Sequence, residues 1–66
     1  MTPTTEIILV GGVRQTVEGD TGDVERTILN AARGSIMELA WFVDSQTGQR
    51  VGVNPAMLVA LRAVGS

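Results

Sequence analysis

The side chains of this 66-residue chain that could do chemistry are few and of restricted types. The sequence contains no His, Cys, Lys or Tyr, so the commonest general bases, nucleophiles and soft metal ligands are missing together. Ser, Thr and seven acidic residues remain. Asp44 and Ser45 stand side by side, but side-chain hydrogen bonds to a turn account for both residue types. We therefore expect no enzyme activity, no catalytic residue, no cofactor and no metal site.

A second combination is aromatic and basic. Trp41 or Phe42 could stack on a nucleic-acid base while Arg14, Arg50 and Arg62 contact phosphates. Adjacent strand residues point to opposite faces, so only one of the two aromatic rings can serve as a platform. The formal net charge of −2 gives a weak electrostatic footprint for a polyanion. Nucleic-acid binding is therefore the alternative prediction.

The first half of the chain predicts a hairpin followed by a helix. Residues 6–10 form a strand that is apolar on both faces, which is typical of an internal or interface strand. Gly11-Gly12 then fits a two-residue turn, because glycine adopts positive φ without steric cost, and a second strand covers 13–18. In this register Val10 faces Val13. A phosphate-binding loop at the two glycines is disfavoured, since neither a Lys nor a helix start lies beside them.

The helix is predicted from its cap and its apolar stripe. Asp20 is the candidate N-cap, and Arg33-Gly34 supplies a basic last turn and a stop. The apolar positions follow helical spacing, and they are Val24, Ile28, Ala31 and Ala32.

The second half predicts a hairpin whose register depends on the length of its loop. A three-residue loop, Gln46-Thr47-Gly48 with Gly48 left-handed, sets Trp41 opposite Val53 and makes one face wholly apolar. Trp41 then lies in the core and Phe42 faces the other way. A slip of one residue would instead place Phe42 opposite Val51 and Trp41 opposite Gly52.

The last segment begins with Asn54-Pro55-Ala56, which cannot continue a strand because proline donates no ladder hydrogen bond. We expect one tight or 3₁₀ turn and then a strand over 57–64, apolar on both faces except at Arg62. A helix over 55–63, with Pro55 in its first turn, is the alternative.

These elements predict a small α+β domain of order β-β-α-β-β-β, either an antiparallel sheet or a small SH3-like or Sm-like open barrel with one helix packed on it. Residues 1–5 are expected to be a flexible lead and 6–64 the domain. The stretches VDSQTGQRV, VNPA and LVALR carry a resemblance: the layout resembles short actinobacterial or actinobacteriophage proteins of unknown function, with a V-N-P-A turn before the last strand. That resemblance implies no active residues.

A chain of this length buries only about 60% of its unfolded surface, so a partner is expected to supplement the core. We predict a non-enzymatic protein-interaction module, a homodimer, another homo-oligomer or a complex with a protein partner, that associates through an apolar sheet face. The expected interface residues are Ile36, Glu38, Phe42, Leu58 and Ala60. No apolar run approaches the roughly 20 residues of a membrane span, so the protein is expected to be soluble and cytoplasmic.

Overall fold

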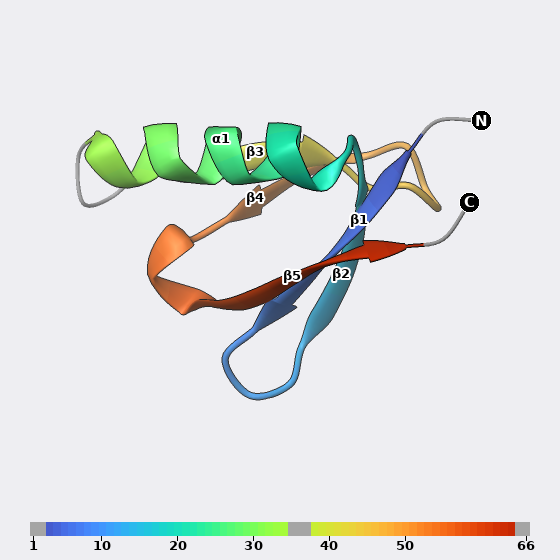
Figure 1. Cartoon of the computed structure of the whole chain (residues 1–66), viewed down its shortest axis with the longest axis horizontal. Helices are drawn as coiled ribbons and strands as arrows, with labels where there is room; N and C mark the ends of the chain where they lie inside the picture. The colour runs from blue at the N-terminus through green and yellow to red at the C-terminus, as the bar shows by residue number, and fades with distance from the viewer. Residues whose placement is uncertain (1–2, 35–37, 65–66) are drawn as a thin grey trace.

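The computed structural model describes residues 3–34 and 38–64, which form five strands and one α-helix (Figure 1). Their order, β-β-α-β-β-β, confirms the predicted α+β architecture. The elements are β1 (Thr4–Leu9), β2 (Arg14–Glu18), α1 (Thr21–Arg33), β3 (Ala40–Val43), β4 (Arg50–Val53), a 3₁₀ turn η1 (Pro55–Met57) and β5 (Leu58–Val64).

The strands form two antiparallel sheets that meet at one point. The order of the first sheet is β2-β1-β5, and β3 and β4 make the second. A single bridge between Val17 and Asp44 joins β2 to β3, and the Ser45 N–H donates to the Thr16 carbonyl at 3.0 Å beside it. β1 therefore has a neighbour on each side, which confirms an internal position for the strand that is apolar on both faces.

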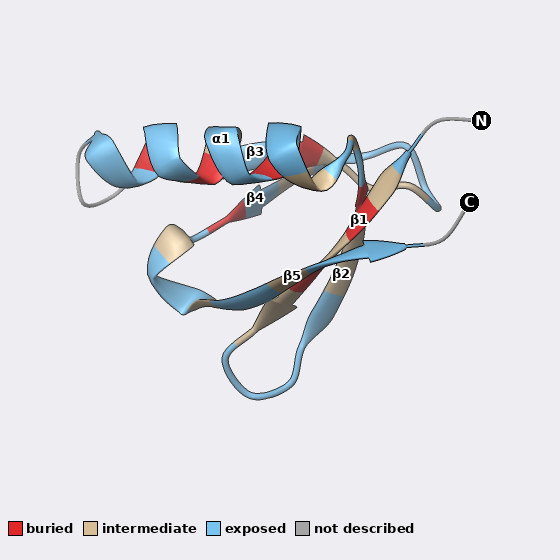
Figure 2. Ribbon diagram, viewed as in Figure 1, coloured by how far each residue is buried: buried red, intermediate tan, exposed pale blue. Residues whose placement is uncertain are grey.

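The core lies between α1 and the faces of the two sheets that are turned toward the helix. The side chains that are buried there are Ile7, Val17, Val24, Ile28, Ala31, Ala40, Phe42 and Val53. Figure 2 shows the buried segments along the sheet-facing side of α1 and on β1, whereas most of β5 is exposed. A core of this size is small even for a short domain, because two of these residues are alanines that bury little apolar area.

The predicted cap and stripe of α1 are largely confirmed. The Asp20 carboxylate accepts a hydrogen bond from the Asp23 N–H at 2.8 Å, which satisfies one free donor of the first turn. Val24, Ile28 and Ala31 are buried as predicted, but Ala32 is exposed. The buried stripe of α1 is therefore narrower than the sequence pattern indicated.

The first hairpin has a longer loop than the predicted two-residue turn. The Leu9 N–H donates to the Val13 carbonyl at 2.8 Å and the Gly12 N–H to the Leu9 carbonyl at 3.1 Å, which leaves a three-residue loop. Gly11 and Gly12 have φ angles of 87° and 81°, so both glycines are needed for positive φ, one in the turn and one in the bulge that follows it. The strand register moves by one residue, and Ile8 rather than Leu9 faces Arg14.

The second hairpin corrects the predicted register in the same way. Trp41 faces Gly52 and Phe42 faces Val51, which is the arrangement expected after a slip of one residue from the predicted register. The loop holds four residues, since the Asp44 N–H donates to the Gln49 carbonyl at 2.8 Å and the Gly48 N–H to the Asp44 carbonyl at 2.9 Å. Gly48 is left-handed as predicted, with φ 75°. A loop one residue longer shifts β3 by one residue against β4, so the side chains of β3 exchange faces while Val51 and Val53 stay on the core side.

The new register reverses the roles of the two aromatic residues. Phe42 is 8% exposed and belongs to the core, whereas Trp41 is 51% exposed. The prediction of a buried Trp41 opposite Val53 was wrong because it assumed a three-residue loop, the length that makes one face of the hairpin wholly apolar. The hydrogen bonds of the Asp44 turn set the loop length instead.

The last segment settles the choice between strand and helix over 55–63. The Asn54 side chain accepts from the Ala56 N–H at 2.9 Å, the Met57 N–H donates to the Asn54 carbonyl at 2.9 Å, and the single 3₁₀ turn then leads into β5. β5 pairs with β1, with a bulge beside Leu58 and Val59. Among the strands that the structure describes, β1 is its one partner, so β5 is an edge strand.

Candidate interaction surfaces

The first candidate site lies on the face of the β3 and β4 hairpin that is turned away from α1. We call it the Trp41 surface, and it comprises Leu39, Trp41, Arg50 and Gly52. A β-carbon at Gly52 would stand 2.9 Å from Leu39 Cδ1 and 3.1 Å from the Trp41 ring, so both side chains cover the position where Gly52 has none. The Arg50 guanidinium lies 4.9 Å from the centre of the Trp41 ring. At an exposed site such a contact contributes about 0.5–1 kcal/mol.

The face of the first sheet that is turned away from α1 also carries charged side chains. Thr5 and Ile7 are buried toward the helix, so by strand alternation Glu6 and Ile8 point the other way. Glu6, whose side chain is only 12% exposed, lies with its Oε1 atom 3.0 Å from Arg62 Nη2. The pair has ion-pair distance without hydrogen-bond geometry, since that oxygen has no hydrogen-bond partner. Arg62 is thus engaged within the chain, and Arg14, which lies on β2 across β1 from it, is also exposed.

The second candidate site is the free edge of β5. We call it the β5 edge and define it as Met57 to Val64. Met57, Val59 and Val64 are exposed by 49%, 63% and 38%, a large apolar area for one strand of a small protein. Edge strands with unpaired backbone groups readily pair with another chain, and Lys, Pro or an inward charge usually protects them. The single charge on β5, Arg62, pairs with Glu6 and does not guard the edge.

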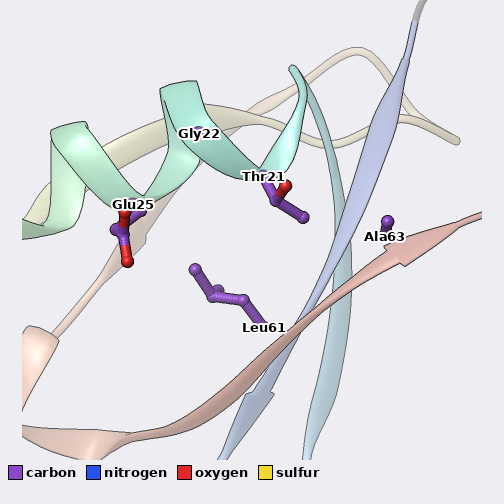
Figure 3. Close-up of a pocket in the computed structure, with 5 residues that line it drawn as sticks. All are labelled: Thr21, Gly22, Glu25, Leu61 and Ala63. Atoms are coloured by element: carbon purple, nitrogen blue, oxygen red, sulfur yellow. The ribbon is translucent and has the colours of Figure 1, made fainter.

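A shallow depression lies beside the β5 edge, between the first turns of α1 and the strand (Figure 3). Its volume is ≈ 420 Å³, and Thr21, Gly22, Glu25, Leu61 and Ala63 line it. The Leu61 side chain points up toward the helix, and Thr21 and Glu25 point down toward the strand. One carboxylate and one hydroxyl above an apolar floor are too few polar groups to orient a small-molecule ligand. The depression extends the apolar area of β5 under the helix.

The Asp44 turn is the remaining polar cluster. The carboxylate accepts from the N–H groups of Gln46 at 2.7 Å and Thr47 at 3.0 Å, and the Gln15 side-chain amide donates to its second oxygen. These donors hold the pKa of Asp44 below its ordinary value, the Gln46 N–H contributing most. The interpretation of Asp44 as a turn-forming residue is confirmed.

The predicted interface residues do not form one surface in the structure. Ile36 lies outside the described residues. Phe42 is buried under α1 and Leu58 is half-buried against the core, whereas Ala60, which pairs with the outward-facing Ile8, is exposed on the opposite face of the sheet. Glu38 is exposed and its carboxylate lies against Gly34 at the end of α1.

Sequence reasoning missed Trp41 and Val59 as exposed apolar residues. A signal for Trp41 was present in Gly52, because a glycine inside a strand often marks the place that a neighbouring ring covers. Val59 had no comparable signal, since its exposure follows from the edge position of β5, which depends on strand order.

In residues 3–34 and 38–64, acidic side chains do not gather in a group of three or more that could hold a metal ion. Over the same ranges, no helix is long and apolar enough to cross a membrane. Comparison with known proteins finds no matching family model, no matching curated protein and no matching solved structure.

Proposed function

We propose that this chain is a non-enzymatic protein-interaction module that self-associates through the β5 edge. The observation that carries this proposal is that β5 has a free edge, with Val59 and Val64 exposed on the strand and Met57 exposed in the turn before it. Neither the turn at Asp44 nor the depression beside α1 offers a nucleophile with an activating base. Association is the function that this surface supports best.

The small core gives a physical reason for association. Domains of this length lie near the lower limit of independent stability, and they usually rely on disulfides, metals or oligomerisation. The chain has no cysteine or histidine. Covering the exposed side chains of β5 would add about 25 cal/mol for each Å² of apolar area removed from water.

The mass of the protein in solution tests the proposal. We expect sedimentation equilibrium at micromolar concentrations to give a multiple of the 7.0 kDa chain mass. Val59→Lys should shift the protein toward the monomer, because a charged side chain on an edge strand opposes pairing with another strand.

Val13→Lys is the matched control, since Val13 is 56% exposed and faces Leu9 on the β2 side of β1, at the opposite edge of the three-stranded sheet. That variant should keep the mass of the natural chain. A natural chain that stays monomeric, or an equal loss of mass in both variants, would contradict the proposal.

Nucleic-acid binding is the second candidate, and the Trp41 surface supports it. Trp41 is exposed with Arg50 beside its ring, and Arg14 and Arg62 lie on the helix-free side of the first sheet. Single-stranded nucleic acid binds to such combinations by stacking and phosphate contacts. Two features weaken this candidate: Arg62 is paired with Glu6, and the net charge of the chain is −2.

Tryptophan fluorescence separates the two candidates, because Trp41 is the single tryptophan of the chain. A nucleic-acid module predicts that single-stranded DNA or RNA quenches Trp41 at low salt and that added salt reverses the quenching. Arg50→Gln should weaken that response. Unchanged emission at low salt would eliminate the second candidate.

A further inference from the structure

We infer that a second copy of this chain adds its β5 antiparallel to the β5 edge, with Leu61 on the two-fold axis. This inference rests on the proposed self-association and specifies its geometry. The two three-stranded sheets would then become one continuous sheet of six strands. A two-fold arrangement uses the same surface on both copies, so the strand has to be complementary to itself.

A strand that pairs with a copy of itself needs free backbone groups at its middle, and the residues of β5 that have them follow from its pairing with β1. The Leu9 N–H bonds to β2 at Val13, and the Val10 N–H bonds to β5 at Met57. Because alternate residues of a strand direct their backbone groups to opposite sides, the even-numbered residues of β1 bond to β5. Their partners on β5 are Ala60, Arg62 and Val64. The residues between them, Leu61 and Ala63, therefore direct their N–H and C=O groups to the free edge.

The length of β5 determines which residue lies on the two-fold axis. β5 runs from Leu58 to Val64, so its middle residue is Leu61. Pairing the whole strand with a second copy places Leu61 opposite the partner's Leu61, and a two-fold axis between antiparallel strands can pass through a hydrogen-bonded pair only if that residue faces the free edge. Leu61 does face it. If the middle residue had been Ala60 or Arg62, its backbone groups would already be bonded to β1.

Charge selects the same register. With Leu61 on the axis, Arg62 stands opposite the partner's Ala60, whose small side chain leaves the Arg62–Glu6 ion pair undisturbed. An axis at Arg62 would set two like charges directly opposite each other, which is destabilising. An axis at Ala60 would pair Ala63 with Met57 and run the ladder into the η1 turn.

Side-chain packing on the helix side of the sheet is also compatible with a two-fold axis at Leu61. The Leu61 side chain lies at the floor of the depression next to α1. In a hydrogen-bonded antiparallel pair the α-carbons are about 5.5 Å apart, so the two Leu61 side chains would touch across the axis. Each copy would thus extend the apolar floor that its partner leaves open beside Thr21 and Glu25.

Amide hydrogen exchange on the unmodified protein tests this geometry residue by residue. The Ala60, Arg62 and Val64 amides, which face β1, should be protected at every concentration. The Leu61 and Ala63 amides should exchange fast when the protein is dilute and slowly when it is concentrated. Fast exchange of the Leu61 and Ala63 amides at concentrations where the protein is a dimer would overturn this geometry, and the proposal of self-association would still hold. A protein that stays monomeric would overturn both.

A substitution gives an independent test. Ala63→Pro removes an N–H that faces the free edge and none that β1 uses, and edge strands tolerate proline at such positions. Symmetry removes two intermolecular hydrogen bonds, so the dimer dissociation constant should rise at least about tenfold. Ala63→Val is the matched control, because it keeps the N–H and should leave the dissociation constant within about threefold. Equal dissociation constants for the two variants would contradict the inference.

Discussion

At the scale of single residues, Asp44 closes the loop of the second hairpin with both its side chain and its backbone. Its carboxylate binds the N–H groups of Gln46 and Thr47, and its backbone groups close the loop with Gln49 and Gly48. The loop length fixed by these bonds decides which aromatic residue is buried. The sequence identifies Asp44 as a turn residue, but it does not say which of several short loops the turn will form.

The lowered pKa of Asp44 leads to a prediction about pH. A carboxyl group whose pKa is lower in the folded state than in the unfolded state stabilises the fold above the unfolded value of about 4, and this contribution is lost as pH falls through the folded pKa. The free energy of unfolding should therefore decline below about pH 4. Denaturant unfolding of the natural chain and of Asp44→Asn between neutral and acid pH measures this decline.

Asp44→Asn should flatten that decline, because asparagine keeps the turn geometry but does not titrate in this range. Glu18→Gln, which changes an exposed carboxylate at the end of β2, is the control and should keep the pH profile of the natural chain. The Asp44 explanation fails if Asp44→Asn loses stability in acid as steeply as the natural chain does.

At the scale of elements, the position and type of helix and strands could be predicted because each has local signals. Asp20 and Gly34 bound α1, and Asn54-Pro55 separates β4 from β5. The registers of both hairpins could not be predicted, since one extra loop residue shifts each ladder by one and changes which side chains of the two strands share a face. The large apolar ring of Trp41 predicted that it is buried, but the hydrogen bonds of the Asp44 turn set a register in which it is exposed. Gly52 has no side chain, and the exposed ring covers this position.

Alanine substitution of the two adjacent aromatic residues tests the register of the second hairpin. Phe42→Ala should cost about 3–5 kcal/mol, because it leaves a cavity in the core, whereas Trp41→Ala should cost about 1 kcal/mol or less. Equilibrium denaturation measures both. If Phe42→Ala unfolds the chain, Phe42→Leu gives a smaller loss that can still be measured. A larger loss for Trp41→Ala than for Phe42→Ala would favour the register with Trp41 opposite Val53 and contradict the one observed.

At the scale of the whole molecule, α1 covers only part of β5, and the outer edge of this strand has no partner among the described strands. α1 packs on β3, and its first turns lie above Leu61 and Ala63 of β5, which runs below the helix in Figure 1. The sequence predicted an uncovered apolar surface, but its place depends on strand order and on which strand lies at the edge. Those features arise from long-range pairing between β1 and β5, which leaves no local pattern.

The concentration dependence of thermal unfolding tests most directly whether this small fold depends on a second copy. If association through β5 stabilises the folded chain, the unfolding midpoint should rise steadily as the protein concentration increases from about 1 μM to 1 mM, by mass action. Val59→Lys should show a weaker rise, and Val13→Lys should follow the natural chain. An unfolding midpoint of the natural chain that stays constant over this range would contradict the account.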